Sequence, residues 1–141
     1  MMSEGRTKEQ QATKALQNRA AEQARTQLDS IIELVTAFRT KREANEDCDD
    51  EEQAIQEDPL CVEVRSAWHA PGDNADVGEY RILLCTGGPA VQIVGELNEY
   101  HEPDTAEIQF QDWFTLWETM PTDEVEEKAM LDYAQCFYFD E

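Results

Sequence analysis

Basic residues are scarce over most of this sequence. The 141 residues include 32 Asp and Glu against 11 Lys and Arg, which gives a formal net charge of −21. Beyond Arg42 only Arg65, Arg81 and Lys128 are basic. Such a chain repels nucleic acid and anionic membranes, which are polyanions themselves. We therefore expect no direct binding to either, and the expected partner presents a basic surface.

Long apolar runs are missing as well. No stretch approaches the roughly 18 apolar residues that a membrane-spanning helix requires, and residues 1–11 lack the apolar segment of a secretory signal peptide. The four cysteines, Cys48, Cys61, Cys85 and Cys136, form no C-x-x-C pair, which is typical of free thiols in a reducing compartment. These features predict a soluble cytoplasmic protein without membrane contact.

Catalytic, cofactor and metal motifs are absent too. Zinc sites of known type need closely spaced Cys or His residues, and only a site assembled from Cys61 and Cys85 on neighbouring strands stays open. Cys85 before Thr86-Gly87-Gly88 superficially resembles a nucleophile beside an anion hole, but a strongly acidic domain disfavours the thiolate. Gly87-Gly88 also lacks the Lys of a phosphate-binding loop. The sequence therefore predicts no enzyme, no cofactor and no metal site.

The charge is unevenly distributed along the chain. Residues 1–42 hold eight basic and five acidic residues, a net +3, whereas residues 43–141 hold three basic and 27 acidic residues, a net −24. Adaptation to high salt would place acids everywhere, so it explains this pattern less well. The sequence indicates a mildly basic segment joined to an acidic body, each with a surface of its own.

Residues from about Thr7 to Asn45 predict one long helix, because they are rich in helix-forming residues and contain no Gly or Pro. An apolar stripe recurs at helical spacing and comprises Ala12, Leu16, Ala20, Ala24, Leu28, Ile31, Ile32, Val35 and Phe38. Its bulky half, residues 28–38, is expected to pack on the rest of the domain. For residues 7–27, packing and a self-association or partner surface are both open.

Residues 43–58 contain nine acids and no basic residue, which is typical of a solvated linker, although a short helix over Asp49–Gln56 stays open. Pro59 ends any helix there. We therefore divide the chain into a long N-terminal helix (1–46), an acidic linker or short helix (47–59) and an acidic α+β domain (60–141).

Alternating apolar and polar residues after Pro59 predict four strands. They span residues 60–68, 80–86, 90–97 and 106–111, and Gly87-Gly88-Pro89 joins the second to the third as a hairpin. In the first strand, Leu60, Val62, Val64 and Trp68 are expected to face the core.

A last helix is predicted after Pro121, with Thr122 as its N-cap and Asp123 and Glu124 in its first turn. Its expected inward stripe comprises Val125, Ala129, Tyr133 and Phe137. The order of elements predicts an α+β fold with a long N-terminal helix, a four-stranded antiparallel sheet and a C-terminal helix packed on the sheet.

Imitation of a polyanion explains the acidity best. A folded protein that displays carboxylates along one face can occupy a basic nucleic-acid-binding groove, with the counterion release and steering that DNA itself uses. Aromatic side chains beside the acids would add anchors. The candidate partner-binding residues are Glu96, Glu99, Glu102, Asp104, Asp112, Trp113, Trp117, Glu118, Asp123, Glu124, Glu126 and Glu127.

Residues 81–117, RILLCTGGPAVQIVGELNEYHEPDTAEIQFQDWFTLW, and the ending YAQCFYF (133–139) resemble a group of small acidic proteins carried by bacterial mobile elements and phages. The resemblance rests on the L-C-T-G-G-P-A turn and the D-W-F corner and covers about residues 60–139. It implies a bacterial host cell and an inhibitor of the anti-CRISPR or antirestriction type. It carries over no catalytic residues.

Two hypotheses follow. In the first, the protein is an acidic inhibitor that mimics nucleic-acid charge and blocks a DNA- or RNA-binding groove of a bacterial defence complex. In the alternative, it is a small non-enzymatic adaptor or regulator that forms a homodimer or binds a partner through its N-terminal helix. On the sequence alone, deletion of residues 1–42 separates them, because mimicry would survive and the adaptor would fail.

Overall fold

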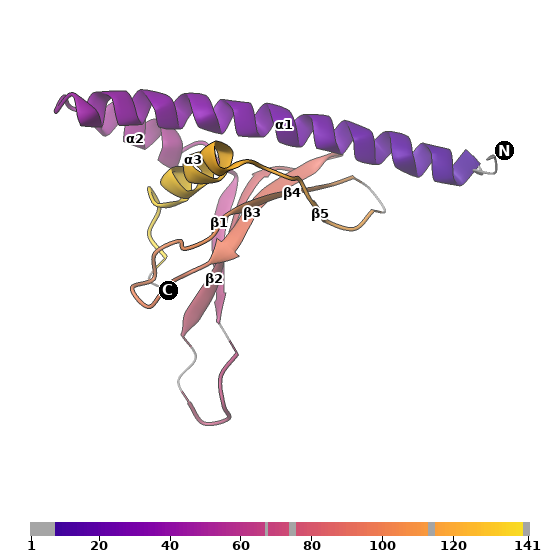
Figure 1. Ribbon diagram of the computed structural model, residues 1–141. Helices are drawn as coiled ribbons and strands as arrows, with labels where there is room; N and C mark the ends of the chain where they lie inside the picture. Colours follow the sequence, from indigo (N-terminus) through magenta and orange to yellow (C-terminus); the bar gives the residue numbers. More distant parts are fainter. Residues whose placement is uncertain (1–7, 67, 74–75, 113–114, 140–141) are drawn as a thin grey trace.

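The computed structural model describes residues 8–66, 68–73, 76–112 and 115–139, and the side chains from residue 18 onward. The long helix α1 (Lys8–Glu43) crosses a five-stranded antiparallel sheet and extends beyond it at its N-terminal end, while α2 and α3 lie beneath its C-terminal half (Figure 1). The α+β class, the helix at each end and the antiparallel sheet are confirmed. The number of strands is five rather than four.

Helix α1 is held in place by the stripe that the sequence predicts. Its fully or almost fully buried residues are Ala20, Ala24, Leu28, Ile31, Val35 and Phe38. The two alanines let the helix approach closely, and the bulkier side chains share one core with the apolar residues of the strands. From Ala20 onward, the stripe therefore packs on the chain's own domain.

The acidic block folds into α2 (Asp49–Gln56), the short helix that the sequence left open. Four acids occupy its first turn, where the helix dipole favours negative charge. Ile55 is fully buried in the core, and the Gln56 Nε2 donates to the backbone carbonyl of Cys136 at 2.9 Å. These two contacts fix an otherwise polar helix to the body.

The sheet is a meander in which each strand pairs with the next along the chain. Its strands are β1 (Cys61–Ser66), β2 (Val77–Cys85), β3 (Ala90–Glu96), β4 (Glu107–Gln111) and β5 (Glu118–Thr119). Ile82, Ile93 and Ile108 face one another across the three central strands and are fully buried. Strand β5 has only two residues, too few for alternation to predict it.

Strand β1 corrects two expectations. It forms one edge of the sheet, and Val62 and Val64 are half-buried on its inner side. Leu60 is 61% exposed and Trp68 is fully exposed, so the prediction that both face the core is wrong. The physical reason is that β1 begins after Leu60 and ends at Ser66, so neither residue lies on the strand over the core.

Helix α3 (Glu124–Ala134) is capped by Asp123, not by the predicted Thr122. The Asp123 carboxylate accepts from the Glu126 N–H at 2.8 Å, and the Glu126 carboxylate accepts from the Asp123 N–H at 3.0 Å, which is a capping box. Ala129 and Tyr133 are buried as predicted, but Val125 is 72% exposed. The buried face also includes Met130 and Ala134, and this places its centre nearer position 126 than 125.

Gly95 lies on β3 where the sheet meets the segment before β4. The Tyr80 hydroxyl donates to the Thr105 carbonyl at 2.6 Å across this position. A Cβ on residue 95 would stand 2.0 Å from that carbonyl oxygen and 2.7 Å from the Tyr80 ring. Only glycine leaves room for this contact.

We expect Gly95→Ala to lower the free energy of unfolding by about 2–3 kcal/mol, because the added methyl group overpacks the site. Urea denaturation followed by tryptophan fluorescence measures it. Gly87→Ala is the matched control, since its Cβ would meet nothing within 4 Å and only its φ of +101° opposes a side chain, at a cost of about 1 kcal/mol. A loss at Gly95 no larger than the loss at Gly87 would contradict the packing.

Candidate partner-binding site

The structure divides the predicted partner-binding residues into three groups. The β3–β4 connection lies at one end of β4 and the β4–β5 connection lies at the other, about 17 Å away for a strand of this length. The third group lies at the start of α3. The groups are residues 96–104, residues 112–118 and residues 123–127, and they do not form one continuous face.

The first group lies on a loop closed by backbone hydrogen bonds. The Asn98 N–H donates to the Glu102 carbonyl at 2.8 Å, and the Asn98 Oδ1 accepts from the N–H groups of Tyr100 and Glu102 at 2.8 and 3.1 Å. The Asp104 N–H donates to the Glu96 carbonyl at 2.8 Å. The four predicted carboxylates of this group, Glu96, Glu99, Glu102 and Asp104, are all exposed.

The neighbouring β1–β2 connection adds a fifth acid at the same end of the sheet. The Leu97 N–H donates to the Gly78 carbonyl at 2.9 Å, and the His101 Nε2 lies 3.0 Å from the Asp76 Oδ1. We call the five acids Asp76, Glu96, Glu99, Glu102 and Asp104 the acidic end. Within the described part of the chain, no Lys or Arg pairs with any of them.

The second group does not present its first carboxylate to solvent. Asp112 is buried, and its Oδ2 accepts from Arg19 Nη2 at 2.9 Å and from Arg19 Nε at 3.3 Å. It therefore anchors α1 to the end of β4 rather than offering a free charge, which corrects the expectation of an exposed Asp112. Trp117 is half-buried and Glu118 is exposed, while Trp113 lies outside the described residues.

Two carboxylates of the third group are engaged in intramolecular hydrogen bonds. Asp123 and Glu126 form the capping box of α3, and the Glu126 Oε2 also accepts from Arg25 Nη1 at 2.6 Å. Glu124 and Glu127 remain exposed. Of this group, only these two carboxylates project to solvent without a structural role in the described contacts.

The basic residues of α1 are turned toward the acidic body. Four ion pairs join them to it: Arg19–Asp112, Arg25–Glu126, Arg39–Asp132 and Lys41–Glu51. Arg42 lies 4.8 Å above the Phe38 ring. In the body, Arg65, Arg81 and Lys128 pair with Glu79, Glu63 and Asp132. Each basic side chain that the structure describes thus has an internal partner, and the excess of acids faces solvent.

Two exposed aromatic residues near the acidic end were not among the predicted contacts. Tyr100, on the closed loop, is 72% exposed, and Trp68, on the β1–β2 connection, is fully exposed. Tyr100 stands between Glu99 and Glu102 in the sequence, and an aromatic residue inside a polar loop is the signal that could have identified it. Such side chains commonly dominate the energy of protein interfaces.

The thiols of Cys85 and Cys136 are not activated. Burial raises the pKa of the Cys85 thiol above its ordinary value, and burial also raises the pKa of Cys136, to about 11. Both shifts favour the thiol over the nucleophilic thiolate. Over the described residues, no group of three or more His, Cys, Asp or Glu is arranged to hold a metal ion.

Comparison of the chain with protein-family models, with curated proteins and with solved structures finds no match. Among the described helices, none combines the length and the apolar character that a bilayer crossing demands. The candidate site therefore rests on the geometry of this chain alone.

We predict that Asp132→Asn lowers the free energy of unfolding at neutral pH by about 2 kcal/mol, because it leaves Arg39 without its buried counter-charge. Burial alone would raise the pKa of Asp132, but hydrogen bonds from Lys128 at 2.8 Å and Arg39 at 2.6 Å outweigh it and lower the pKa. Since the pKa is lower in the folded state, this stability is present above the unfolded value near 4 and is lost as pH falls through the folded value.

Urea denaturation of the wild type and of Asp132→Asn between about pH 7 and pH 3 measures their free energies of unfolding. The difference between the two free energies should shrink toward zero as the pH falls. Asp29→Asn serves as the control, because Asp29 pairs with Arg25 on the exposed surface of α1 and should contribute less than about 0.5 kcal/mol. A difference between wild type and Asp132→Asn that stays constant with pH would refute the role of the charge.

Proposed function

We propose that the protein is an inhibitor that blocks a DNA- or RNA-binding groove of a bacterial defence complex, of the anti-CRISPR or antirestriction type, by imitating nucleic-acid charge. The acidic end makes the contact, with Tyr100 and Trp68 as anchors. One observation carries the proposal: a hydrogen-bonded loop presents exposed carboxylates that have no Lys or Arg partner among the described residues, and the described Lys and Arg side chains are all engaged within the molecule.

The arrangement suits competition with a polyanion. Carboxylates on a closed loop are already positioned, so little conformational entropy is lost when they meet Lys and Arg side chains. The net charge of −21 steers the protein toward a positive groove and away from nucleic acid itself. That the groove belongs to a bacterial defence complex is part of the proposal and is what the resemblance of residues 81–117 implies.

The test begins with capture of partners from a bacterial lysate on the immobilised protein, followed by binding measurements with the purified partner. We expect affinity to fall at least about tenfold between about 50 and 200 mM NaCl, because ions screen the charged contacts. Saturating duplex or guide nucleic acid should displace the protein. Undiminished binding to a partner whose groove is already filled would falsify the proposal.

A paired substitution locates the contact. Glu99→Gln with Glu102→Gln removes two charges from the acidic end and should weaken partner binding about tenfold or more, as expected for charge-assisted contacts. Glu43→Gln with Glu46→Gln removes the same net charge from exposed positions at the α1–α2 turn and should change affinity by less than about threefold. Equal losses from the two pairs would indicate net charge alone rather than this loop.

The adaptor hypothesis places the partner surface on the N-terminal helix. Ala20 and Ala24, both in the predicted partner region, are buried against the chain's own core. Deletion of residues 1–42 would remove much of that core and cannot separate the hypotheses. Deletion of residues 1–16 spares every buried side chain that the structure describes, and sedimentation and partner binding should be unchanged by it if the acidic end is the working surface.

A further inference from the structure

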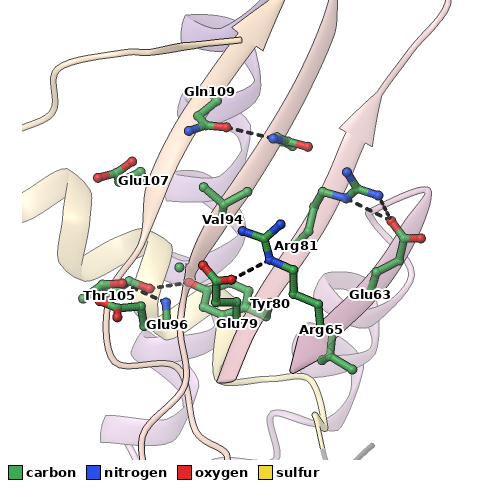
Figure 2. A pocket seen from close by; sticks show the side chains of 13 residues that line it. Glu63, Arg65, Glu79, Tyr80, Arg81, Val94, Glu96, Thr105, Glu107 and Gln109 are labelled. Atoms are coloured by element: carbon green, nitrogen blue, oxygen red, sulfur yellow. Dashed lines mark hydrogen bonds and ion pairs between the residues drawn. The ribbon is translucent and has the colours of Figure 1, made fainter. Parts of the chain in front are cut away.

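The face of the sheet opposite α1 is hollowed. Side chains of β1 to β4 surround a cavity of about 560 Å³ that is open to solvent (Figure 2). Because side chains alternate along a strand, the positions that point away from the core meet here. The walls are polar and charged, and Val94 contributes the apolar side chain labelled in the middle of the view.

Two ion pairs line one side of this hollow. Arg65 donates to the Glu79 carboxylate, and Arg81 donates to Glu63, in each case between the neighbouring strands β1 and β2 (Figure 2). The hydrogen bond from Arg65 holds the pKa of Glu79 below its ordinary value. These two guanidinium groups are therefore already neutralised.

The other side carries negative charge without a counter-charge. Glu96 at the end of β3 and Glu107 at the start of β4 are exposed, and no basic side chain among the described residues pairs with either. Glu107 faces Val94 directly across the two strands. With both arginines paired, the hollow retains a net charge of −2 from these two carboxylates.

A buried acceptor in the same hollow lacks a donor. Gln92 on β3 is only 4% exposed, and its Nε2 donates to the Gln109 Oε1 at 2.8 Å. Its own Oε1 is buried and accepts no hydrogen bond. Gln92 faces Gln109 directly, and Gln109 lies two residues from Glu107 on the same face of β4. A buried acceptor without a donor costs about 1–3 kcal/mol, so a donor supplied from outside would recover stability.

We propose that this hollow binds an arginine side chain of the protein partner. A guanidinium group has five N–H donors in a planar fork and keeps its charge at all physiological pH values. Once a rotation of the Gln92 side chain uncovers the Oε1, the group can donate to it and to the Glu107 carboxylate together, since diagonal neighbours on adjacent strands lie about 7–8 Å apart at their Cα atoms. The inference deepens the proposed function, on which it rests, because Glu96 belongs both to the acidic end and to the hollow.

An anion is a poorer occupant, although two arginines line the site. Both guanidinium groups already bind carboxylates. An anion would be repelled by the uncompensated Glu96 and Glu107, and it has no hydrogen-bond donor for the Gln92 Oε1. A lysine ammonium carries the charge but offers a single point of contact rather than a fork.

The test titrates the ¹⁵N-labelled full-length protein with the capped tripeptide Ac-Gly-Arg-Gly-amide and follows the side-chain amide signals of Gln92 and Gln109 by NMR. We expect saturable shifts of these two signals. The citrulline peptide, which has the same shape without the charge, and the lysine peptide should each bind about tenfold more weakly. Equal binding of the citrulline peptide, or shifts confined to residues 97–104, would overturn the assignment.

Two variants separate binding from folding. Glu107→Gln should weaken binding of the arginine peptide about tenfold, whereas Glu43→Gln, which removes an equal charge from an exposed position outside the hollow and the acidic end, should leave it unchanged. Gln92→Leu removes the buried acceptor together with the hydrogen bond to the half-buried Gln109, so it should change the melting temperature little while lowering affinity several-fold. Wild-type affinity in both Glu107→Gln and Gln92→Leu would contradict the proposal.

The outcome is distinguishable from that of the proposed function. Competition with nucleic acid for the purified partner tests the acidic end and does not depend on the tripeptide. If the protein competes with nucleic acid but shows no arginine-dependent shift at Gln92, the proposed function stands and the assignment of the hollow as an arginine site is wrong. A protein that binds the tripeptide but not a nucleic-acid-binding partner would give the reverse result.

Discussion

Helix α1 packs on the sheet through an apolar stripe, and ion pairs from basic residues beside this stripe join the helix to the rest of the domain. The stripe from Ala20 to Phe38 shares its core with β2, β3, β4 and α3, and Arg25 and Arg39 reach carboxylates on α3. The apolar contact supplies the driving force, and the arginines set the register of the helix on the body. Since α2 contacts α1 and its Ile55 enters the same core, the position of α2 also depends on this attachment.

The same attachment determines which acids remain available. Asp112, Glu126 and Asp132 are neutralised by arginines of α1, so the excess negative charge resides on the rest of the surface. At one end of the sheet this charge is carried by a hydrogen-bonded loop, and on the open face it lies along one side of the hollow. Glu96 is shared by both places. The basic residues of α1 thus pair with acidic residues of the body within the same molecule, and the charge left on the described surface is acidic.

Periodicity predicted most of the fold. Strands in residues 80–111 and helix α1 each bury one face. Burial of one face requires apolar residues at a regular spacing, and this spacing can be read from the local sequence. The predicted core positions of Val125 and Trp68 are wrong because local spacing does not show where a helix face is centred or where a strand ends. The predicted Thr122 cap lies one residue too early because Thr122 and Asp123 are both good caps, and only the reciprocal hydrogen bonds with Glu126 distinguish them.

The site was less accessible to sequence reasoning. Asp112 resembles its exposed neighbours, and its burial follows from Arg19, a residue 93 positions away that local patterns do not connect to it. The burial of Gln92 could not be predicted from the sequence for a related reason. A polar residue that points outward from a strand is expected to be solvated, and Gln92 is buried only among its neighbours in the assembled sheet, such as Gln109.

The sequence separation of the ion pairs has a consequence for how the chain folds as it is made. Arg25 and Arg39 meet their partners 101 and 93 residues later, so α1 leaves the ribosome long before α3 exists. Until α3 follows, the apolar stripe of α1 lacks the part of the core that α3 supplies. Because contacts this distant in sequence form slowly, we expect the pairing of α1 with α3 to limit the folding rate.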